Sequence, residues 1–174
     1  ARLGVLGLFA IMGALLSTFL SRMPSVRDLL DVSPSGLASL IVFGAAGALV
    51  GLLVTGWSAA KFGTRAILWW SSFSYLGAFA LVAVSTEMGS KPLFALGHFF
   101  VSFSFAFTNV AMNAEAAEVE RRMDRAVMPQ FHAAFSIGMA VGLGVGAVLS
   151  HAGVLPVWHF IVIGTILTAV RLAI

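Results

Sequence analysis

Apolar residues in this chain are gathered into six long runs, and most of the charged residues lie between them. The runs cover about residues 2–22, 35–60, 66–86, 92–120, 127–150 and 157–173. Each is close to or above the roughly 20 residues that a helix needs to cross a bilayer. None alternates with the period of two that is typical of strands in a membrane barrel. Because backbone polar groups must be satisfied inside lipid, the pattern predicts an all-α membrane protein with six transmembrane helices.

The composition supports one membrane domain. Charged residues make up 10% of the 174 residues and hydrophobic residues 60%, whereas about a quarter of a typical soluble domain is charged. The connections are too short for a second domain, so we expect residues 1–174 to form a single six-helix transmembrane domain. The chain has no initiator Met and stops just after the sixth run, which suggests a part of a longer protein.

The same composition argues against several classes of site. Cysteine is absent, which excludes disulfides and thiolate metal sites. The four histidines have no metal-ligand spacing with Asp or Glu, so neither a metal nor a cofactor is expected. The net charge of +3 comes from a few cations in the connections and indicates no nucleic-acid surface.

The cations predict how the chain is oriented. Seven would face the cytoplasm if both ends lay there: Arg2, Lys61, Arg65, Arg121, Arg122, Arg125 and Arg171. Three would face outward: Arg22, Arg27 and Lys91. Because cytoplasmic connections carry an excess of Lys and Arg, we expect a multi-pass protein of the cell (inner) membrane with both ends cytoplasmic.

Prolines at the starts of alternate runs suggest an internal repeat. Ser33 followed by Pro34 is typical of a helix N-terminus, and Pro92 and Pro156 open the fourth and sixth runs in a similar way. All three lie on the expected outer side. The spacing predicts two three-helix units in inverted topology.

The connection at residues 56–65 resembles the signature loop of the major facilitator superfamily. That motif has a glycine, an aspartate four residues on, a basic residue, a second glycine and further basic residues. The residues that match are Gly56, Lys61, Gly63 and Arg65. Ala60 stands where the family usually has its aspartate. Taken alone, the segment also fits a generic cytoplasmic loop, but six helices and cytoplasmic ends fit the amino-terminal half of such a transporter.

A narrower resemblance links residues 109–113 and 131–138 to the fucose permease branch of that superfamily and its uncharacterised bacterial relatives. In the sugar/proton symporters of the branch, an acidic residue precedes a span-four asparagine by four positions, and a Phe-x-Ser-x-Gly-like stretch opens span five. Asn113 matches the asparagine, and Asn109 replaces the acid. The resemblance implies a transporter and favours a sugar as solute.

Four polar residues are candidates for binding the solute. Asn109 and Asn113 are four apart and share one helix face, where their amides suit a polyol; the alternative is hydrogen bonding between helices. His132 is a candidate at the inner cavity, or a plain interfacial histidine. Arg22 is a candidate at the outer mouth, although snorkelling to the headgroups is favoured.

Glu115 is the candidate for proton coupling, because a carboxylate near the edge of the hydrocarbon is costly unless it is wet or paired. Snorkelling, or pairing with His132 or with an arginine of an inner connection, is the alternative. Glu120 and Arg121 belong to a cluster of mixed charge, which predicts a solvated, salt-bridged helix end. Any functional part of that cluster would be to lock an inner gate.

Glycines in the second and fifth runs predict close packing between helices. They are Gly44, Gly47, Gly51 and Gly56 in the second run, and Gly138, Gly142, Gly144 and Gly146 in the fifth. Drug/proton antiporters of the superfamily have a proline directly after a glycine of span five. Here Leu143 follows Gly142, which argues against the antiporter branch.

Together these features predict a secondary active transporter that moves a small polar solute, with a sugar favoured, by alternating access. Its partners would be the solute, the bilayer and a second six-helix half, supplied by the same gene or by a dimer partner. No enzyme is expected, because no nucleophile with a base, carboxylate pair or metal cluster occurs at a shared depth. A non-transporting solute sensor or assembly partner is the alternative, and efflux of another small molecule is the alternative among transporters.

Overall fold

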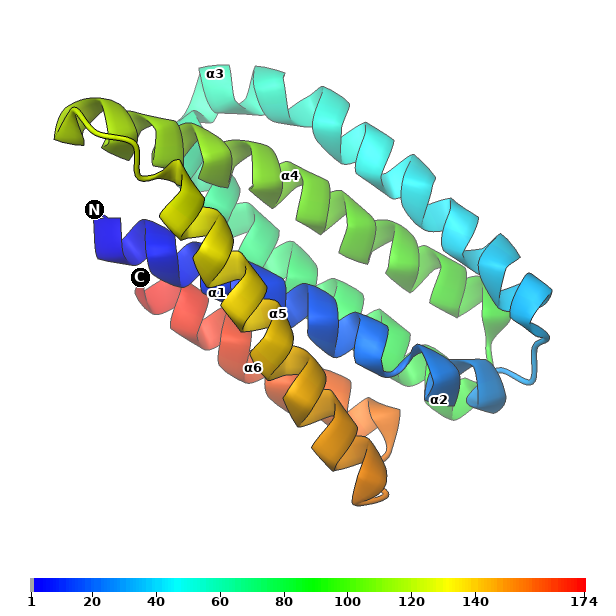
Figure 1. Cartoon of the computed structure of the whole chain (residues 1–174). Coiled ribbons are helices and arrows are strands. Elements are labelled where there is room, and N and C mark those ends of the chain that lie inside the picture. Colours follow the sequence, from blue (N-terminus) through cyan, green and yellow to red (C-terminus); the bar gives the residue numbers. More distant parts are fainter. Residues whose placement is uncertain (1) are drawn as a thin grey trace.

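The computed structural model describes residues 2–174, which form helices joined by short connections (Figure 1). The helices are α1 (Arg2–Ser21), α2 (Met23–Leu29), α3 (Pro34–Met88), α4 (Lys91–Met123), α5 (Met128–His151) and α6 (Pro156–Ala173). With α1 and α2 taken together, five helices in this range are long and apolar enough to cross a bilayer. The prediction of an all-α membrane protein is therefore confirmed at the level of helix type and hydropathy.

Helix α3 contains the second and third predicted runs and reverses its direction at Gly63. Gly63 has φ 80° and ψ 159°, which is not helical, and a positive φ of this kind is readily adopted by glycine. A straight helix of 55 residues would be about 80 Å long, far more than a bilayer core of about 30 Å. Figure 1 shows that the chain instead returns along itself in two arms, which we call arm A (residues 34–62) and arm B (residues 64–88).

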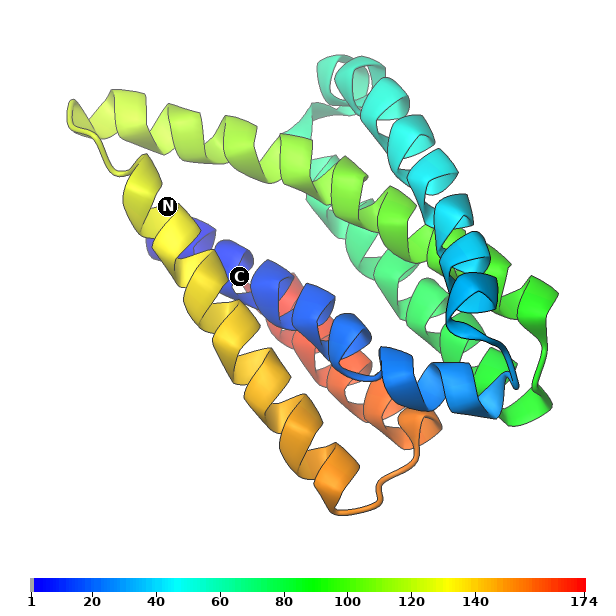
Figure 2. The same ribbon diagram turned by 45° about the vertical axis from the view of Figure 1, so that its right-hand side comes forward.

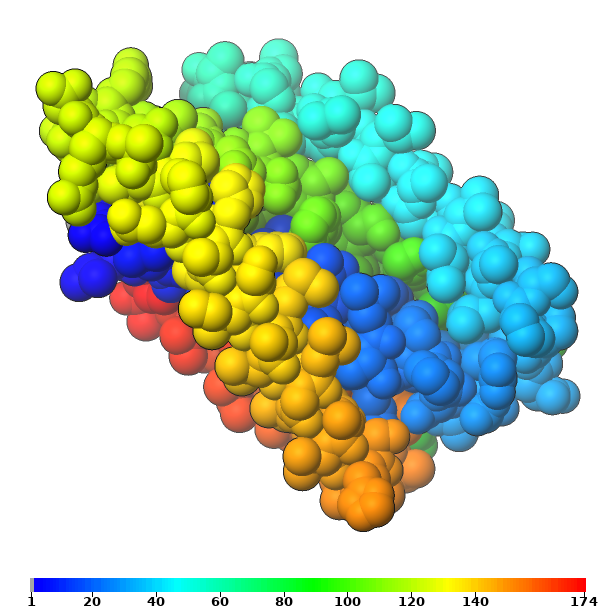
Figure 3. All heavy atoms as spheres, viewed as in Figure 1, coloured from blue at the N-terminus to red at the C-terminus, as the bar shows by residue number. Residues whose placement is uncertain are grey.

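The helices are arranged in two neighbouring groups. Helices α5 and α6 lie beside α1, and both arms of α3 lie with α4 (Figure 2). Contacts of α3 with α6, and of α1 with α4, join the groups. On the face seen in Figure 3, α5 crosses over α1. The core between them is apolar and includes Phe9, Leu15, Phe79, Phe94 and Phe160.

Helix starts follow the predicted local signals. Ser33 caps α3, with its Oγ accepting a hydrogen bond of 3.1 Å from the backbone N of Gly36, and Pro34 opens the first turn. Pro92 and Pro156 likewise lie in the first turns of α4 and α6. These prolines lie at the end of the bundle that carries α2, which we call the α2 end. We call the opposite end, where α1 begins and α6 ends, the terminal end (Figure 1).

Close packing through glycines is confirmed for six of the eight predicted positions. A Cβ on Gly138, Gly142 or Gly146 would lie within 2.1 Å of an atom of α1. A Cβ on Gly44, Gly47 or Gly51 would lie within 2.6 Å of an atom of α4. The prediction is wrong for Gly56 and Gly144, where a Cβ would meet nothing within 4 Å. Among residues 2–174, no other helix covers the faces on which these two glycines lie.

Candidate functional site

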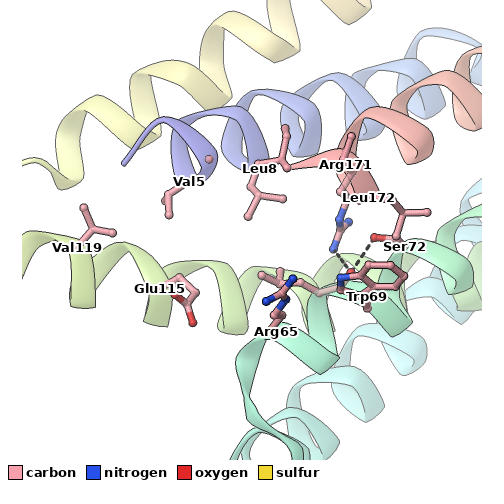
Figure 4. A pocket seen from close by; sticks show the side chains of 13 residues that line it. Val5, Leu8, Arg65, Trp69, Ser72, Glu115, Val119, Arg171 and Leu172 are labelled. Carbon is pink, nitrogen blue, oxygen red and sulfur yellow. Dashed lines mark hydrogen bonds between the residues drawn. The ribbon is translucent and has the colours of Figure 1, made fainter. Parts of the chain in front are cut away.

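A cavity of about 510 Å³ lies at the terminal end, among four helices (Figure 4). Its walls come from the first turns of α1, the start of arm B, the last turns of α4 and the end of α6. The polar side chains that line it are Arg65, Trp69, Ser72, Glu115 and Arg171. Its volume falls in the range of about 300–1,000 Å³ that is typical of small-molecule sites.

Arg171 is buried at the edge of this cavity, with 6% of its surface exposed. Its Nη2 donates hydrogen bonds of 2.6 Å to Ser71 Oγ, 2.9 Å to Thr108 Oγ1 and 3.3 Å to the carbonyl of Leu68. The guanidinium also lies over the Tyr75 ring, 5.6 Å from its centroid. The side chain therefore ties α6 to arm B and to α4.

The sequence alone predicts that Arg171 is one of the exposed cations of the cytoplasmic face. The residue lies at that end of α6, but its side chain turns into the bundle. The sequence does contain a signal of this buried position, because Arg171 lies inside the apolar run 157–173. The other six cations assigned to the cytoplasmic face lie at the edge of a run or in a connection.

Glu115 lines the cavity from α4, opposite the predicted signature loop. Its Oε1 accepts a hydrogen bond from the hydroxyl of Thr64, which lies inside that loop. Arg65, the next residue, lines the same cavity. Within residues 2–174, no ion pair joins Glu115 to an arginine or to His132. The carboxylate is therefore partnered by the loop that turns at Gly63.

The rest of the signature loop is held by aromatic contacts. Lys61 Nζ lies 5.0 Å from the centroid of the Trp57 ring and 5.2 Å from that of Phe62, which is within the range of cation–π attraction. Gly63 provides the turn that the motif predicts. Gly56 lies in regular helix, so the close approach predicted for it is not found.

Asn109 and Asn113 do share one face of α4, as predicted. Asn113 Nδ2 donates 2.8 Å to the backbone carbonyl of Asn109 and 3.2 Å to Asn109 Oδ1. Both side chains are half-buried. In the described part of the chain, neither amide hydrogen-bonds to another helix, so the pair does not join helices to each other.

The two other predicted solute-binding residues lie apart from this pair. Arg22 has only 2% of its surface exposed, and its Nη2 donates to the carbonyl of Val154 in the connection between α5 and α6, at the α2 end. His132 is exposed on α5, with its ring 5.4 Å from that of Phe9. The structure therefore does not bring the four residues together in one pocket.

The mixed-charge cluster at the end of α4 is salt-bridged, as predicted. Glu118 pairs with Arg121 and, at 2.6 Å, with Arg122. Glu120 has a role that its sequence position does not predict. Its Oε2 accepts hydrogen bonds of 2.7 Å from the backbone N of both Val127 and Met128, which satisfies free donors at the start of α5. Glu120 thus fixes the connection between α4 and α5.

Comparison with known proteins identifies relatives over most of the chain. No family model and no solved structure matches it. An uncharacterized transporter of Sinorhizobium fredii is 30% identical over 160 residues, which are 91% of this chain and 41% of that protein. An uncharacterized MFS-type transporter of Yersinia pestis is 26% identical over 148 residues, which are 85% of this chain and 38% of that protein.

The chain spans about two fifths of the length of these curated relatives. Both are named as transporters, and the name of the second gives the family that the loop at residues 56–65 resembles. These agreements confirm that the chain resembles transporters of the major facilitator type over most of its length.

Proposed function

We propose that this chain is the amino-terminal six-helix half of a secondary active transporter, which moves a small polar solute by alternating access. The observation that carries the proposal is the similarity to two transporters over most of this chain but only about two fifths of theirs. A second six-helix half, from the same gene or a dimer partner, would supply the other wall of a central cavity.

Helix contacts support six crossings arranged as two inverted units. If arms A and B of α3 are separate crossings, an inverted repeat exchanges the first crossing with the fourth and the second with the fifth. The packing of arm A on α4 then corresponds to that of α5 on α1. Both contacts are made through glycines (Figure 2).

The positions of the charged connections support cytoplasmic ends. The turn at Gly63 and the connection between α4 and α5 lie at the terminal end with both ends of the described chain (Figure 1). That end carries the cations at positions 61, 65, 121, 122 and 125. Because cytoplasmic connections are rich in Lys and Arg, we place the terminal end in the cytoplasm of a cell whose inner membrane holds the protein.

A sugar is the favoured solute because Asn109 and Asn113 together offer donors and acceptors on one face of α4. Asn113 Nδ2 and Asn109 Oδ1 are engaged with each other, whereas Asn113 Oδ1 and Asn109 Nδ2 have no hydrogen-bond partner among the described residues. The remaining amide atoms are free to bind paired hydroxyls. His132 and Arg22 are further candidates on the same path, His132 at its inner end and Arg22 at its outer end.

Uptake of labelled neutral sugars into proteoliposomes, with the full-length native protein, tests this function. For a transported sugar, Asn113→Ala should weaken binding by roughly one to two decades, because a hydroxyl would lose its partner. Gln130→Ala removes an amide outside the proposed site and should leave binding unchanged. Sugar binding without flux would instead favour a solute sensor, and flux only of other solutes would favour the efflux alternative.

Glu115 is better suited to a gate than to a proton relay, because its partner is the signature loop at the terminal end. Glu120 and Arg121 lie at the same end and belong to this proposed gate. Glu115→Gln retains an acceptor for Thr64, so accumulation of solute should persist in this variant. A collapse of pH-driven uptake in Glu115→Gln, with exchange preserved, would show that Glu115 carries the coupling proton.

A further inference from the structure

Arg171 is a buried cation that forms no ion pair with any residue in 2–174. Its three hydrogen-bond acceptors are two hydroxyls and a backbone carbonyl, all neutral. The Nε and Nη1 atoms have no hydrogen-bond partner among the described residues. A guanidinium removed from water is costly unless a counter-charge and further hydrogen bonds compensate for it. The side chain therefore lacks both a negative partner and two acceptors.

The cavity that Arg171 lines carries a second cation. Arg65 stands on the wall formed by arm B and forms no ion pair with any residue in 2–174 (Figure 4). Glu115 is the carboxylate among the lining residues, and it is engaged by the Thr64 hydroxyl. Two arginines and one carboxylate therefore line the cavity, so its lining carries a net positive charge.

We propose that this cavity binds a phosphate group between Arg171 and Arg65. Guanidinium groups hold phosphate oxygens through short, charge-assisted hydrogen bonds. The indole N–H of Trp69 adds a further donor to the same wall. The phosphate supplies the negative charge that Arg171 lacks, and it joins α6 to arm B on the cytoplasmic side.

Two sources present this chemistry at the cytoplasmic edge of a membrane. One is the headgroup of an anionic phospholipid, because basic pockets between transmembrane helices on this side suit such headgroups. The other is free inorganic phosphate. The site is separate from the proposed solute face, since neither Asn109 nor Asn113 lines the cavity. The inference therefore does not depend on sugar transport.

The test measures the unfolding midpoint of the full-length native protein, first in delipidated detergent solution with added phosphate. Sodium chloride at equal ionic strength is the control for screening. In the second arm the protein is reconstituted into vesicles of phosphatidylglycerol or of phosphatidylcholine. A bound ligand raises the midpoint in a concentration-dependent way. We expect a rise with phosphate, with phosphatidylglycerol, or with both, and the responding arm identifies the source.

Variants separate this site from general electrostatic attraction. Arg65→Gln and Arg171→Gln should each weaken the apparent affinity by about tenfold or more, the usual effect of losing a charge-assisted hydrogen bond. Arg125→Gln removes an exposed cation of the same end and should leave the affinity unchanged. Arg65 is exposed, so its variant decides the matter if Arg171→Gln does not fold. No rise with either probe, or an equal rise in Arg65→Gln and the native protein, overturns the proposal.

Discussion

Two helix pairs meet through glycines: α5 with α1, and arm A with α4. Contacts with backbone and contacts with side chains follow each other in opposite order along α5 and along arm A. In α5, a Cβ on Gly138 would lie 1.9 Å from the backbone oxygen of Ala10, whereas one on Gly146, two turns later, would meet Ser21 Oγ at 2.1 Å. The α5 pair therefore begins backbone to backbone and ends against a side chain.

In arm A the order is reversed. A Cβ on Gly44 would lie 2.3 Å from His98 Nε2, whereas one on Gly47 would lie 2.1 Å from the backbone oxygen of Phe99. Arm A begins and α5 ends at the α2 end of the bundle (Figure 1). In both pairs, therefore, the glycine nearer the α2 end faces a side chain of the neighbouring helix. The glycine further from that end faces its backbone. Matched positions of an inverted repeat would instead face the same kind of neighbour at opposite ends of the bundle, so this order follows the end of the bundle and not the repeat.

The largest expected effect is at the backbone contacts. Gly138→Leu and Gly47→Leu would place a side chain where main-chain atoms cannot move aside, and overpacking typically costs about 1–3 kcal/mol and sometimes more. We expect loss of folded protein in both, measured as the monodisperse fraction on size-exclusion chromatography.

Gly144→Leu is the matched control for α5, because a Cβ there meets nothing within 4 Å. It should give a normal yield. If Gly138→Leu folded as well as Gly144→Leu, α5 would not approach α1 as described.

A smaller loss of stability, which a second substitution can reverse, is expected where a glycine of α5 faces a side chain of α1. Gly146→Ala would press on Ser21 Oγ and Cβ, at 2.1 and 2.5 Å. The added Ser21→Gly removes both atoms and should restore the unfolding midpoint.

The same repair should fail at the other end of the pair. Gly138→Ala meets the main chain of Ala10, so adding Ala10→Gly removes none of the clashing atoms. Equal rescue at both positions would contradict the distinction between backbone and side-chain contacts.

The smallest effect is expected where the glycines face open space. Gly56→Ala and Gly144→Ala have regular helical backbone and no neighbour within 4 Å. Because alanine favours helix over glycine by up to about 1 kcal/mol, both should unfold at an equal or slightly higher temperature than the native protein. A clear loss of stability in either one would reveal a packing partner at that position.

Features set by neighbouring residues were predictable from the sequence. The Ser33 cap, the proline-led helix starts and the shared face of Asn109 and Asn113 depend on spacings of four residues or fewer. The close packing of Gly138, Gly142 and Gly146 was also predictable, because residues that are four apart lie on the same face of a helix. Gly144 breaks that period and therefore lies on another face.

Features set by distant residues were not predictable in this way. Arg171 meets Ser71 and Thr108, which are 100 and 63 positions away in the chain. Glu115 meets Thr64 across 51 positions. A lone arginine in an apolar run shows that a partner is needed, but only the fold shows which residues provide it.

The central claim is that α3 crosses the membrane twice, so that the chain has six crossings with both ends in the cytoplasm. Single cysteines in place of Lys61, Arg122, Asp28 and Lys91, labelled in sealed cells with a membrane-impermeant thiol reagent, test this claim most directly. Residues 1–174 contain no native cysteine that would interfere. We expect Asp28→Cys and Lys91→Cys to label from outside, and Lys61→Cys and Arg122→Cys to label only after the cells are opened. Labelling of Lys61→Cys and Lys91→Cys from the same side would mean that arm B does not cross, and the six-crossing architecture would be wrong.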